Sequence, residues 1–271
     1  MNRDVLRQIS VILITIVTLI VNGLATALPL NGVTTAKLSD SYWIRFVPAG
    51  YVFSVWGIIY TFLIAFCVYQ ALPSKREDPR LRAIGWWFVV GSAANTLWLL
   101  FWHYYQVEIT LVMMLTLLAT LIYTVTTLVR MPARTITERI CVDLPFHIYT
   151  GWISVATVVN VSVVIFRHGT FSDETAIFWT LVLIGVAAVL AISQRILRQD
   201  TAYGMVIAWA LYGLGVKQIQ YVTNEAHLPP APQLVSVASM TAISLASVLF
   251  AWWLLDRVRM LMRNAATKTT A

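Results

Sequence analysis

The chain has 271 residues, of which 59% are hydrophobic and only 11% are charged. An ordinary soluble domain carries about 25% charged residues, so composition excludes a water-soluble fold of this size. The formal net charge of +7 does not indicate nucleic-acid binding here, because the basic residues lie in short loops between apolar blocks. The lipid bilayer is therefore the expected partner, and no nucleic acid is expected.

Apolar blocks long enough to cross a bilayer recur along the whole chain. About 20 helical residues span the hydrocarbon core, and lipid offers no hydrogen-bond partner to an open backbone, so each block predicts a helix. The predicted fold class is all-α, a polytopic membrane helix bundle of about eight transmembrane helices. In chain order these cover residues 9–28, 50–72, 84–106, 108–130, 140–166, 174–197, 202–222 and 234–256.

The basic residues predict the orientation of the bundle. Fifteen of the 19 Lys and Arg residues fall on the side that holds both termini. The four on the other side are Lys37, Arg45, Arg167 and Lys217. Because Lys and Arg are enriched in cytoplasmic loops, we expect both termini to be cytoplasmic. We expect an integral protein of the plasma (cytoplasmic) membrane.

The N-terminal block has an alternative interpretation as a cleaved signal peptide. Ala25-Thr26-Ala27 resembles a cleavage site. The apolar stretch before it runs about 20 residues, longer than the usual 7–15 of a signal sequence, and this favours a retained first helix.

Aromatic and amide side chains form single-faced stripes on three predicted helices. Helical spacing aligns them, and at 1.5 Å rise per residue Trp56 lies about 9 Å below the outer end of its helix. By the same measure Asn95 and Trp98 lie from the midplane outward, as do Trp152, Ala156 and Asn160. Two interpretations remain open: interhelical packing with amides as hydrogen-bond partners, or a flat, aromatic-walled pocket for a small molecule. The stripes comprise Phe53, Trp56 and Tyr60 on the second helix, Asn95 and Trp98 on the third, and Tyr149, Trp152, Ala156 and Asn160 on the fifth.

Two ionisable residues lie within predicted spans. Asp143 is near Arg139, one turn from the cytoplasmic end of the fifth helix, and Lys217 is near the outer end of the seventh. Snorkelling to the interface explains charges near helix ends. For Lys217 a bound anionic group is the alternative. A retinal Schiff base there would want a buried carboxylate counter-ion, and the third helix, 84–106, has no Asp or Glu.

At these residues the sequence resembles the TspO/translocator-protein family, also called tryptophan-rich sensory proteins. The resemblance covers roughly residues 1–166. The chain departs from the family pattern at Ala49, where a second Pro is usual, and in three helices that follow residue 166. The matching motifs are Pro48, Tyr51-Val52-Phe53 and Trp56-Gly57-Ile58-Ile59-Tyr60 on the second helix, Asn95-Thr96-Leu97-Trp98 on the third, and Pro145, Tyr149, Trp152 and Asn160 on the fifth.

The resemblance implies a five-helix transmembrane unit over 1–166, with a pocket beneath the first loop that binds porphyrins and, in some members, sterols. Residues 167–262 then form three additional transmembrane helices, and 263–271 a cytoplasmic tail. The loop 29–49, with Trp43 and Arg45, would be a lid, and Arg45 or Lys217 would meet a ligand propionate. Carried over residue by residue, the ligand-binding residues are Trp56, Tyr60, Asn95, Trp98, Tyr149, Trp152, Ala156 and Asn160.

The predicted function is a membrane receptor or carrier for a flat hydrophobic ligand such as a porphyrin or other tetrapyrrole, with no required cofactor. The alternative is a secondary transporter of a small hydrophobic or amphipathic molecule, in which the last three helices complete the path. Enzymatic degradation of the porphyrin is a third hypothesis. The sequence shows no metal-ligand cluster and no catalytic nucleophile–base arrangement, so we expect neither an enzyme nor a metal site. Family members often dimerise, so a homodimer is also considered.

Overall fold

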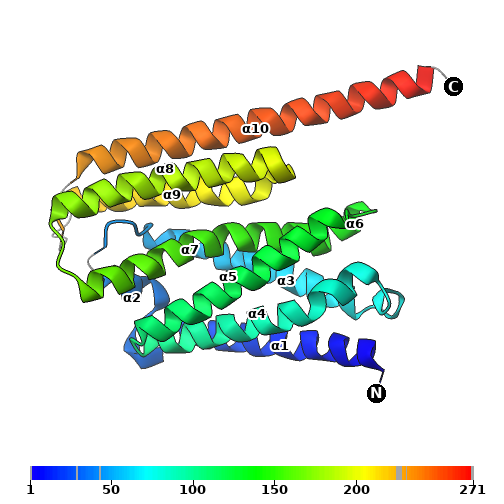
Figure 1. Cartoon of the computed structure of the whole chain (residues 1–271), viewed down its shortest axis with the longest axis horizontal. Helices are drawn as coiled ribbons and strands as arrows, with labels where there is room; N and C mark the ends of the chain where they lie inside the picture. Colours follow the sequence, from blue (N-terminus) through cyan, green and yellow to red (C-terminus); the bar gives the residue numbers. More distant parts are fainter. Residues whose placement is uncertain (1, 29, 43, 224–227, 230, 270–271) are drawn as a thin grey trace.

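The architecture is built from long helices that run back and forth along one axis (Figure 1). The computed structural model describes residues 2–28, 30–42, 44–223, 228–229 and 231–269, with only the backbone described for some residues in α1, α9 and α10. The long helices are α1 (Arg3–Ala27), α3 (Val55–Ala71), α4 (Pro79–His103), α5 (Val107–Arg130), α7 (Leu144–His168), α8 (Asp173–Arg198), α9 (Thr201–Thr223) and α10 (Pro232–Thr269). The short helical segments are η1 (Leu30–Gly32), α2 (Thr35–Asp40), η2 (Gly50–Ser54), η3 (Pro73–Lys75), α6 (Ile136–Glu138) and η4 (Arg139–Asp143).

The predicted fold class, a polytopic membrane helix bundle, is confirmed. Within the described residues, seven segments are long and apolar enough to cross a membrane. The remaining long helix, α9, packs against α7, α8 and α10. Enclosure by neighbouring helices reduces its contact with lipid, so it tolerates polar residues such as Lys217 and Gln218 in its last turns. The seven segments are Arg3–Ala25, Gly50–Ala71, Pro79–His103, Val107–Arg130, Ile136–His168, Asp173–Arg198 and Pro232–Arg259.

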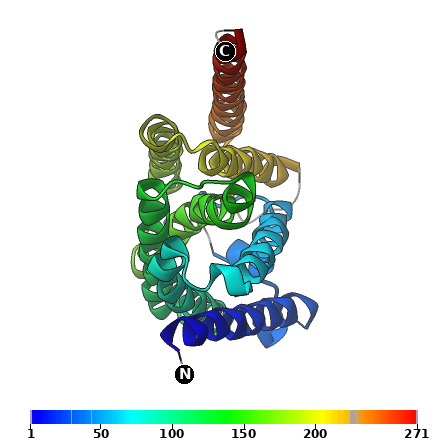
Figure 2. The same ribbon diagram turned by 90° about the vertical axis from the view of Figure 1, so that its right-hand side faces the viewer.

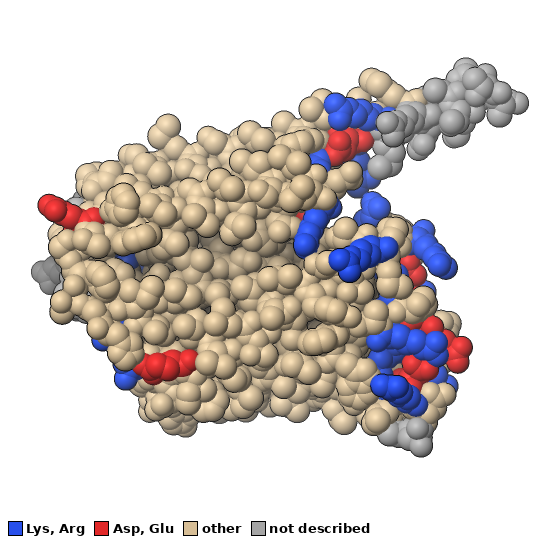
Figure 3. All heavy atoms as spheres, in the orientation of Figure 1, with Lys and Arg blue, Asp and Glu red and all other residues tan. Residues whose placement is uncertain are grey.

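The orientation of the bundle follows from where its charges lie. Both ends of the chain lie at the same end of the bundle (Figure 1), which Figure 2 shows end-on. In Figure 3 most of the visible Lys and Arg side chains gather at that end, which the enrichment of basic residues in cytoplasmic loops predicts to be the cytoplasmic end. The sides of the bundle present large apolar side chains, among them Val68, Val189 and Met240, as contact with lipid tails requires.

The first loop contains a helix that the sequence did not predict. Thr34 begins α2 by accepting a hydrogen bond from the Lys37 backbone N–H through its side chain, an ordinary N-cap. Leu38 and Ser39 of this short helix are buried. The loop therefore folds down onto the outer end of the bundle instead of extending away from it.

The last three helices pack directly on this outer end through α9. The Ala49 N–H donates a 2.9 Å hydrogen bond to the Gly213 carbonyl, and Trp209 Nε1 donates to the Val52 carbonyl at 3.4 Å. A Cβ placed on Gly213 would lie 2.1 Å from a methyl carbon of Val52. The backbone of α9 approaches this closely only because position 213 has no side chain.

We expect Gly213→Ala to lower the free energy of unfolding by about 1–3 kcal/mol, because the added methyl would overlap Val52. Gly185 provides the matched control, since it lies on an exposed face of α8 and a Cβ there meets no atom within 4 Å. Gly185→Ala should be neutral or stabilising by up to about 1 kcal/mol, the gain in helix propensity. Thermal unfolding in detergent micelles measures both. Equal melting temperatures for the two variants would show that the close approach is unimportant.

Candidate functional site

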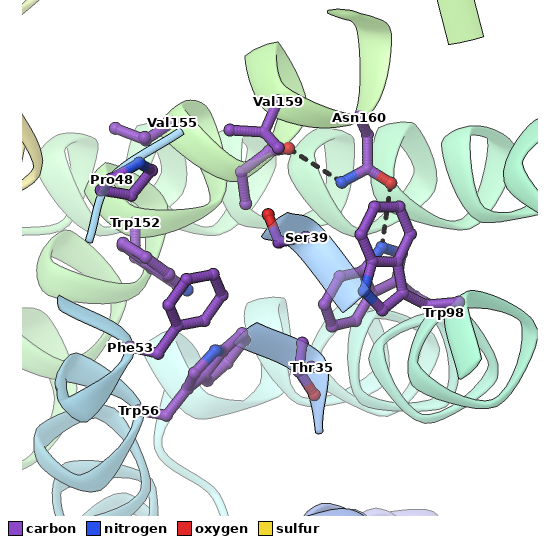
Figure 4. A pocket seen from close by; sticks show the side chains of 12 residues that line it. Thr35, Ser39, Pro48, Phe53, Trp56, Trp98, Trp152, Val155, Val159 and Asn160 are labelled. Carbon is purple, nitrogen blue, oxygen red and sulfur yellow. Dashed lines mark hydrogen bonds between the residues drawn. The ribbon is translucent and has the colours of Figure 1, made fainter. Parts of the chain in front are cut away.

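A small cavity lies inside the outer half of the bundle, beneath α2. Its walls come from α2, the segment leading into α3, and helices α4 and α7. Figure 4 shows Phe53, Trp56 and Trp152 on one side of the space and Trp98 on the other, with Thr35 and Ser39 of α2 between them in this view. The lining residues are Thr35, Ser39, Pro48, Phe53, Trp56, Trp98, Trp102, Trp152, Val155, Ala156, Val159 and Asn160.

The Trp56 indole is the centre of an aromatic cluster. It stacks on Tyr60 with 5.3 Å between ring centroids and lies 6.4 Å from Trp98. The rings of Tyr149 and Trp152 meet it edge-on at 5.8 and 6.2 Å. Offset and edge-to-face contacts of this kind contribute about 0.5–1.5 kcal/mol each beyond the area that they bury. The cluster thereby fixes three helices, α3, α4 and α7, against one another.

Asn160 fixes the far wall of the cavity. Its side-chain carbonyl accepts a 3.1 Å hydrogen bond from Trp98 Nε1, and its amide nitrogen donates to the Ala156 carbonyl at 2.9 Å. The predicted stripe on the fifth helix thus meets the predicted stripe on the third. This bond orients the Trp98 ring, whose other face stacks on Trp102 at 6.0 Å.

Three polar groups that line the cavity have no hydrogen-bond partner among the described residues. They are Trp102 Nε1, Trp152 Nε1 and the Ser39 hydroxyl, and all three atoms are buried. A buried donor left without a partner costs about 1–3 kcal/mol, so such groups are rare and call for an explanation. Their gathering around one space gives the cavity the means to bind a molecule that carries hydrogen-bond acceptors.

Three of the predicted ligand-binding residues lie behind the lining. Tyr60 and Tyr149 contact the ring of Trp56 from outside the cavity. Asn95 is 0% exposed and accepts a 3.2 Å hydrogen bond from Asn22 of α1. The other five predicted residues, Trp56, Trp98, Trp152, Ala156 and Asn160, line the cavity directly.

The cavity is nearly filled by its own walls. Its free space is about 20 Å³, which is room for about one water molecule. Any flat organic molecule therefore requires the aromatic rings to part or α2 to move.

Helix α2 closes the cavity, and an ion pair at its C-terminal end ties it to α9. Lys217 of α9 forms a 2.9 Å ion pair with Asp40, the last residue of α2. Two residues later in the chain, burial raises the pKa of the Tyr42 phenol above its ordinary value, so this group stays neutral. Trp43, which the sequence assigned to the lid, lies outside the described residues.

Arg45 is the most highly bonded group of the first loop and is only 1% exposed. Its Nε donates to Asp173 at the start of α8 at 2.6 Å, and its terminal nitrogens donate to Gln218 at 3.4 Å and to the Pro229 carbonyl at 2.9 Å. Gln218 Nε2 donates back to the Arg45 carbonyl at 3.1 Å. Neither Arg45 nor Lys217 lines the cavity, because both are engaged in these contacts between the loop and the last helices.

Several lining residues were not among the predicted site residues. Val155 and Val159 share the α7 stripe with Trp152 and Asn160, so helical spacing could have identified them. Trp102 is buried and lies one helical turn after Trp98, so helical spacing could have identified it too. Thr35 and Ser39 had no sequence signal, because the fold of the first loop places them. In the part of the chain that the structure describes, no group of three or more His, Cys, Asp or Glu residues is arranged to hold a metal ion.

Comparison with known proteins identifies one family. The family described as TSPO-like protein matches residues 8–254, a range that includes α8, α9 and most of α10. No curated protein and no solved structure matches the chain.

We expect Arg45→Met to lower the free energy of unfolding by about 3 kcal/mol. This is the lower end of the range for breaking a buried ion pair, because the Asp173 side chain remains 37% exposed. Arg167→Met is the control: Arg167 also lies at the outer end, but its ion pair with Glu108 is exposed and should contribute less than about 1 kcal/mol. Denaturant unfolding in micelles measures both losses. Similar losses would mean that Arg45 does not hold the first loop to the last helices.

Proposed function

We propose a ligand-binding function from an established premise: the chain belongs to the TSPO-like protein family. In this proposal the protein is a receptor or carrier, set in the plasma membrane with both termini inside. Its aromatic cavity takes a flat hydrophobic ligand with peripheral acceptor groups, such as a porphyrin. It needs no cofactor and leaves its ligand chemically unchanged.

The observation that carries this proposal is the set of unpartnered donors between aromatic faces. Trp56, Trp98 and Trp152 offer flat apolar surfaces around one space. Trp102 Nε1, Trp152 Nε1 and the Ser39 hydroxyl offer hydrogen bonds that no described residue uses. A mostly apolar cavity with a few convergent polar groups is the usual build of a small-molecule site. A ligand that carries acceptor groups would supply the partners that these three donors lack.

Binding in this proposal requires α2 to swing away from the cavity. A tetrapyrrole is far larger than the free space of about 20 Å³, and α2 contributes Thr35 and Ser39 to the wall. One ion pair, between Asp40 and Lys217, ties the end of α2 to α9. The Asp40 side chain is 37% exposed, so water competes for it and the tie is weak enough to break. Helix α2 then acts as the lid.

We expect protoporphyrin to quench the tryptophan fluorescence of the purified protein at micromolar concentration. Trp152→Phe keeps an aromatic ring but removes the N–H, so its affinity should fall about threefold to tenfold, the value of one hydrogen bond. Trp87→Phe is the control, because Trp87 is exposed on the lipid face of α4 and its loss should leave affinity unchanged. Wild-type protein that is not quenched would contradict the ligand assignment.

Two substitutions that add the same bulk at different positions test where the ligand binds. Ala156→Leu adds bulk to the lining and should abolish quenching by occupying the space that the ligand enters. Ala119→Leu adds the same bulk on an exposed face of α5 and should bind like the wild type. Equal binding by both variants would place the ligand elsewhere on the protein.

The transporter and enzyme alternatives differ from binding in what happens after the ligand enters. We expect protein in liposomes to bind protoporphyrin without carrying it across the bilayer. Porphyrin absorbance should decline no faster than in protein-free liposomes, in light or in darkness. Flux that Trp56→Ala or Asn95→Ala abolishes would establish a transporter. Loss of absorbance with wild-type protein but not with Trp56→Phe would establish degradation.

A further inference from the structure

A second and larger hollow lies at the opposite, cytoplasmic end of the bundle, between the five-helix unit and the turn that joins α8 to α9. Its volume is about 460 Å³, more than twenty times the free space of the aromatic cavity. Its walls come from the end of α5, the segment after it, η4, the start of α7 and the α8–α9 turn. The lining residues are Leu128, Val129, Pro132, Ala133, Arg139, Asp143, Leu144, His147, Arg198, Gln199, Asp200, Thr201 and Ala202.

The hollow is lined by two arginines, Arg139 and Arg198. Their backbones are bonded within their helices, but neither guanidinium group makes a hydrogen bond or an ion pair with a described residue. Both carboxylates in the lining are already engaged. Asp143 is bound by Arg80, and Asp200 is bound by His147.

With Arg80 counted as the partner of Asp143, the two lining arginines outnumber the one remaining carboxylate, Asp200, so a net positive charge remains on the hollow. Asp200 additionally accepts a 2.9 Å hydrogen bond from the Tyr203 backbone N–H, so each of its two carboxylate oxygens has a partner within the protein. A guanidinium group presents planar, paired N–H donors that match a phosphate group. Two such groups on one concave surface suit an anionic phosphate better than an isolated lysine would.

Two local backbone features, a π-helical turn and a left-handed residue, position the two arginines at this hollow. Arg139 opens the π-helical turn η4, a wider turn that accommodates Pro145, whose ring would clash with the Cys141 carbonyl in a regular α-helix. Arg198 ends α8, and Gln199 follows it in the left-handed conformation with φ 55°. The two arginines thus come from two different elements, η4 and α8.

The hollow combines basic and apolar side chains, as a binding site for a lipid headgroup would. It lies at the end where basic side chains gather (Figure 3), level with the cytoplasmic leaflet. Part of its wall is apolar, with Leu128, Val129 and Leu144. Ala202 lines both this hollow and an adjoining apolar groove of about 320 Å³ that includes Met205 and Trp209. An amphipathic molecule would find a charged subsite and an apolar surface side by side.

We infer that Arg139 and Arg198 bind the phosphate group of an anionic phospholipid of the cytoplasmic leaflet. The lipid would bridge the five-helix unit and the α8–α9 turn at the end opposite the aromatic cavity. Basic pockets between helices on the cytoplasmic side have the chemistry for such headgroups. The inference does not depend on what occupies the aromatic cavity.

The test is lipid binding to the full-length protein by native mass spectrometry, with phosphatidylglycerol and phosphatidylcholine compared. The Arg139→Gln/Arg198→Gln double variant should bind phosphatidylglycerol about 25-fold more weakly than the wild type, from about fivefold for each arginine near an anionic surface. The control, Arg3→Gln/Arg134→Gln, removes the same charge from two exposed residues outside the hollow and should bind as the wild type does. Melting temperatures without added lipid should agree among all three proteins.

Two further measurements distinguish a phospholipid headgroup from soluble inorganic phosphate as the bound group. Wild-type protein should bind phosphatidylglycerol more tightly than phosphatidylcholine, and inorganic phosphate at millimolar concentration should neither compete nor raise the melting temperature. If inorganic phosphate binds as tightly and only the hollow variant loses it, the lipid assignment is wrong and the site serves a soluble phosphate. If both double variants lose the same affinity, or neither loses any, the two arginines do not form a site.

Discussion

The buried guanidinium group of Arg45 is the interaction on which the outer end of this protein depends. It joins the first loop to the start of α8, to α9 and to the segment before α10. An unpaired charge at this depth would be strongly unfavourable, so the loop and the last helices have to dock together to satisfy it. The same docking positions α2 over the aromatic cavity. The last three helices thus contribute to the cavity without lining it, by holding the loop that closes it.

A backbone hydrogen bond also holds the first loop to α9. It involves Ala49, one of the positions where the sequence departs from the TspO pattern. The TspO pattern usually has a second Pro where this chain has Ala49. A proline has no N–H, whereas the Ala49 N–H donates to the Gly213 carbonyl of α9. Ala49 and Gly213 of α9 are therefore the two partners of one backbone contact. Gly213 completes it by allowing the backbones to meet. The family match to residues 8–254 includes both partners of this contact.

Helix positions, the placement of both termini at one end of the bundle and the aromatic faces could be predicted from the sequence, because each rests on local periodicity or on charge in short loops. Helical spacing alone aligned Trp152 with Asn160, and the structure brings Asn160 to Trp98. The contribution of α2 could not be predicted, because Ser39 reaches the cavity only through the fold of the first loop. The ion pair that Lys217 forms could not be predicted from the sequence either. Its partner Asp40 lies far away in the sequence, and only tertiary packing shows that the two charges meet.

The aromatic cluster and the unpartnered donors together constrain what the cavity can accept. In the closed cavity the rings satisfy one another by stacking and edge contacts, so a ligand has to replace those contacts with equally good ones. Only a flat, polarisable molecule does so at small cost. The N–H groups of Trp102 and Trp152 gain nothing from ring stacking. A ligand that brings acceptors to them removes a penalty already present in the closed state, and this difference favours a flat ring with polar substituents over a plain hydrocarbon of the same size.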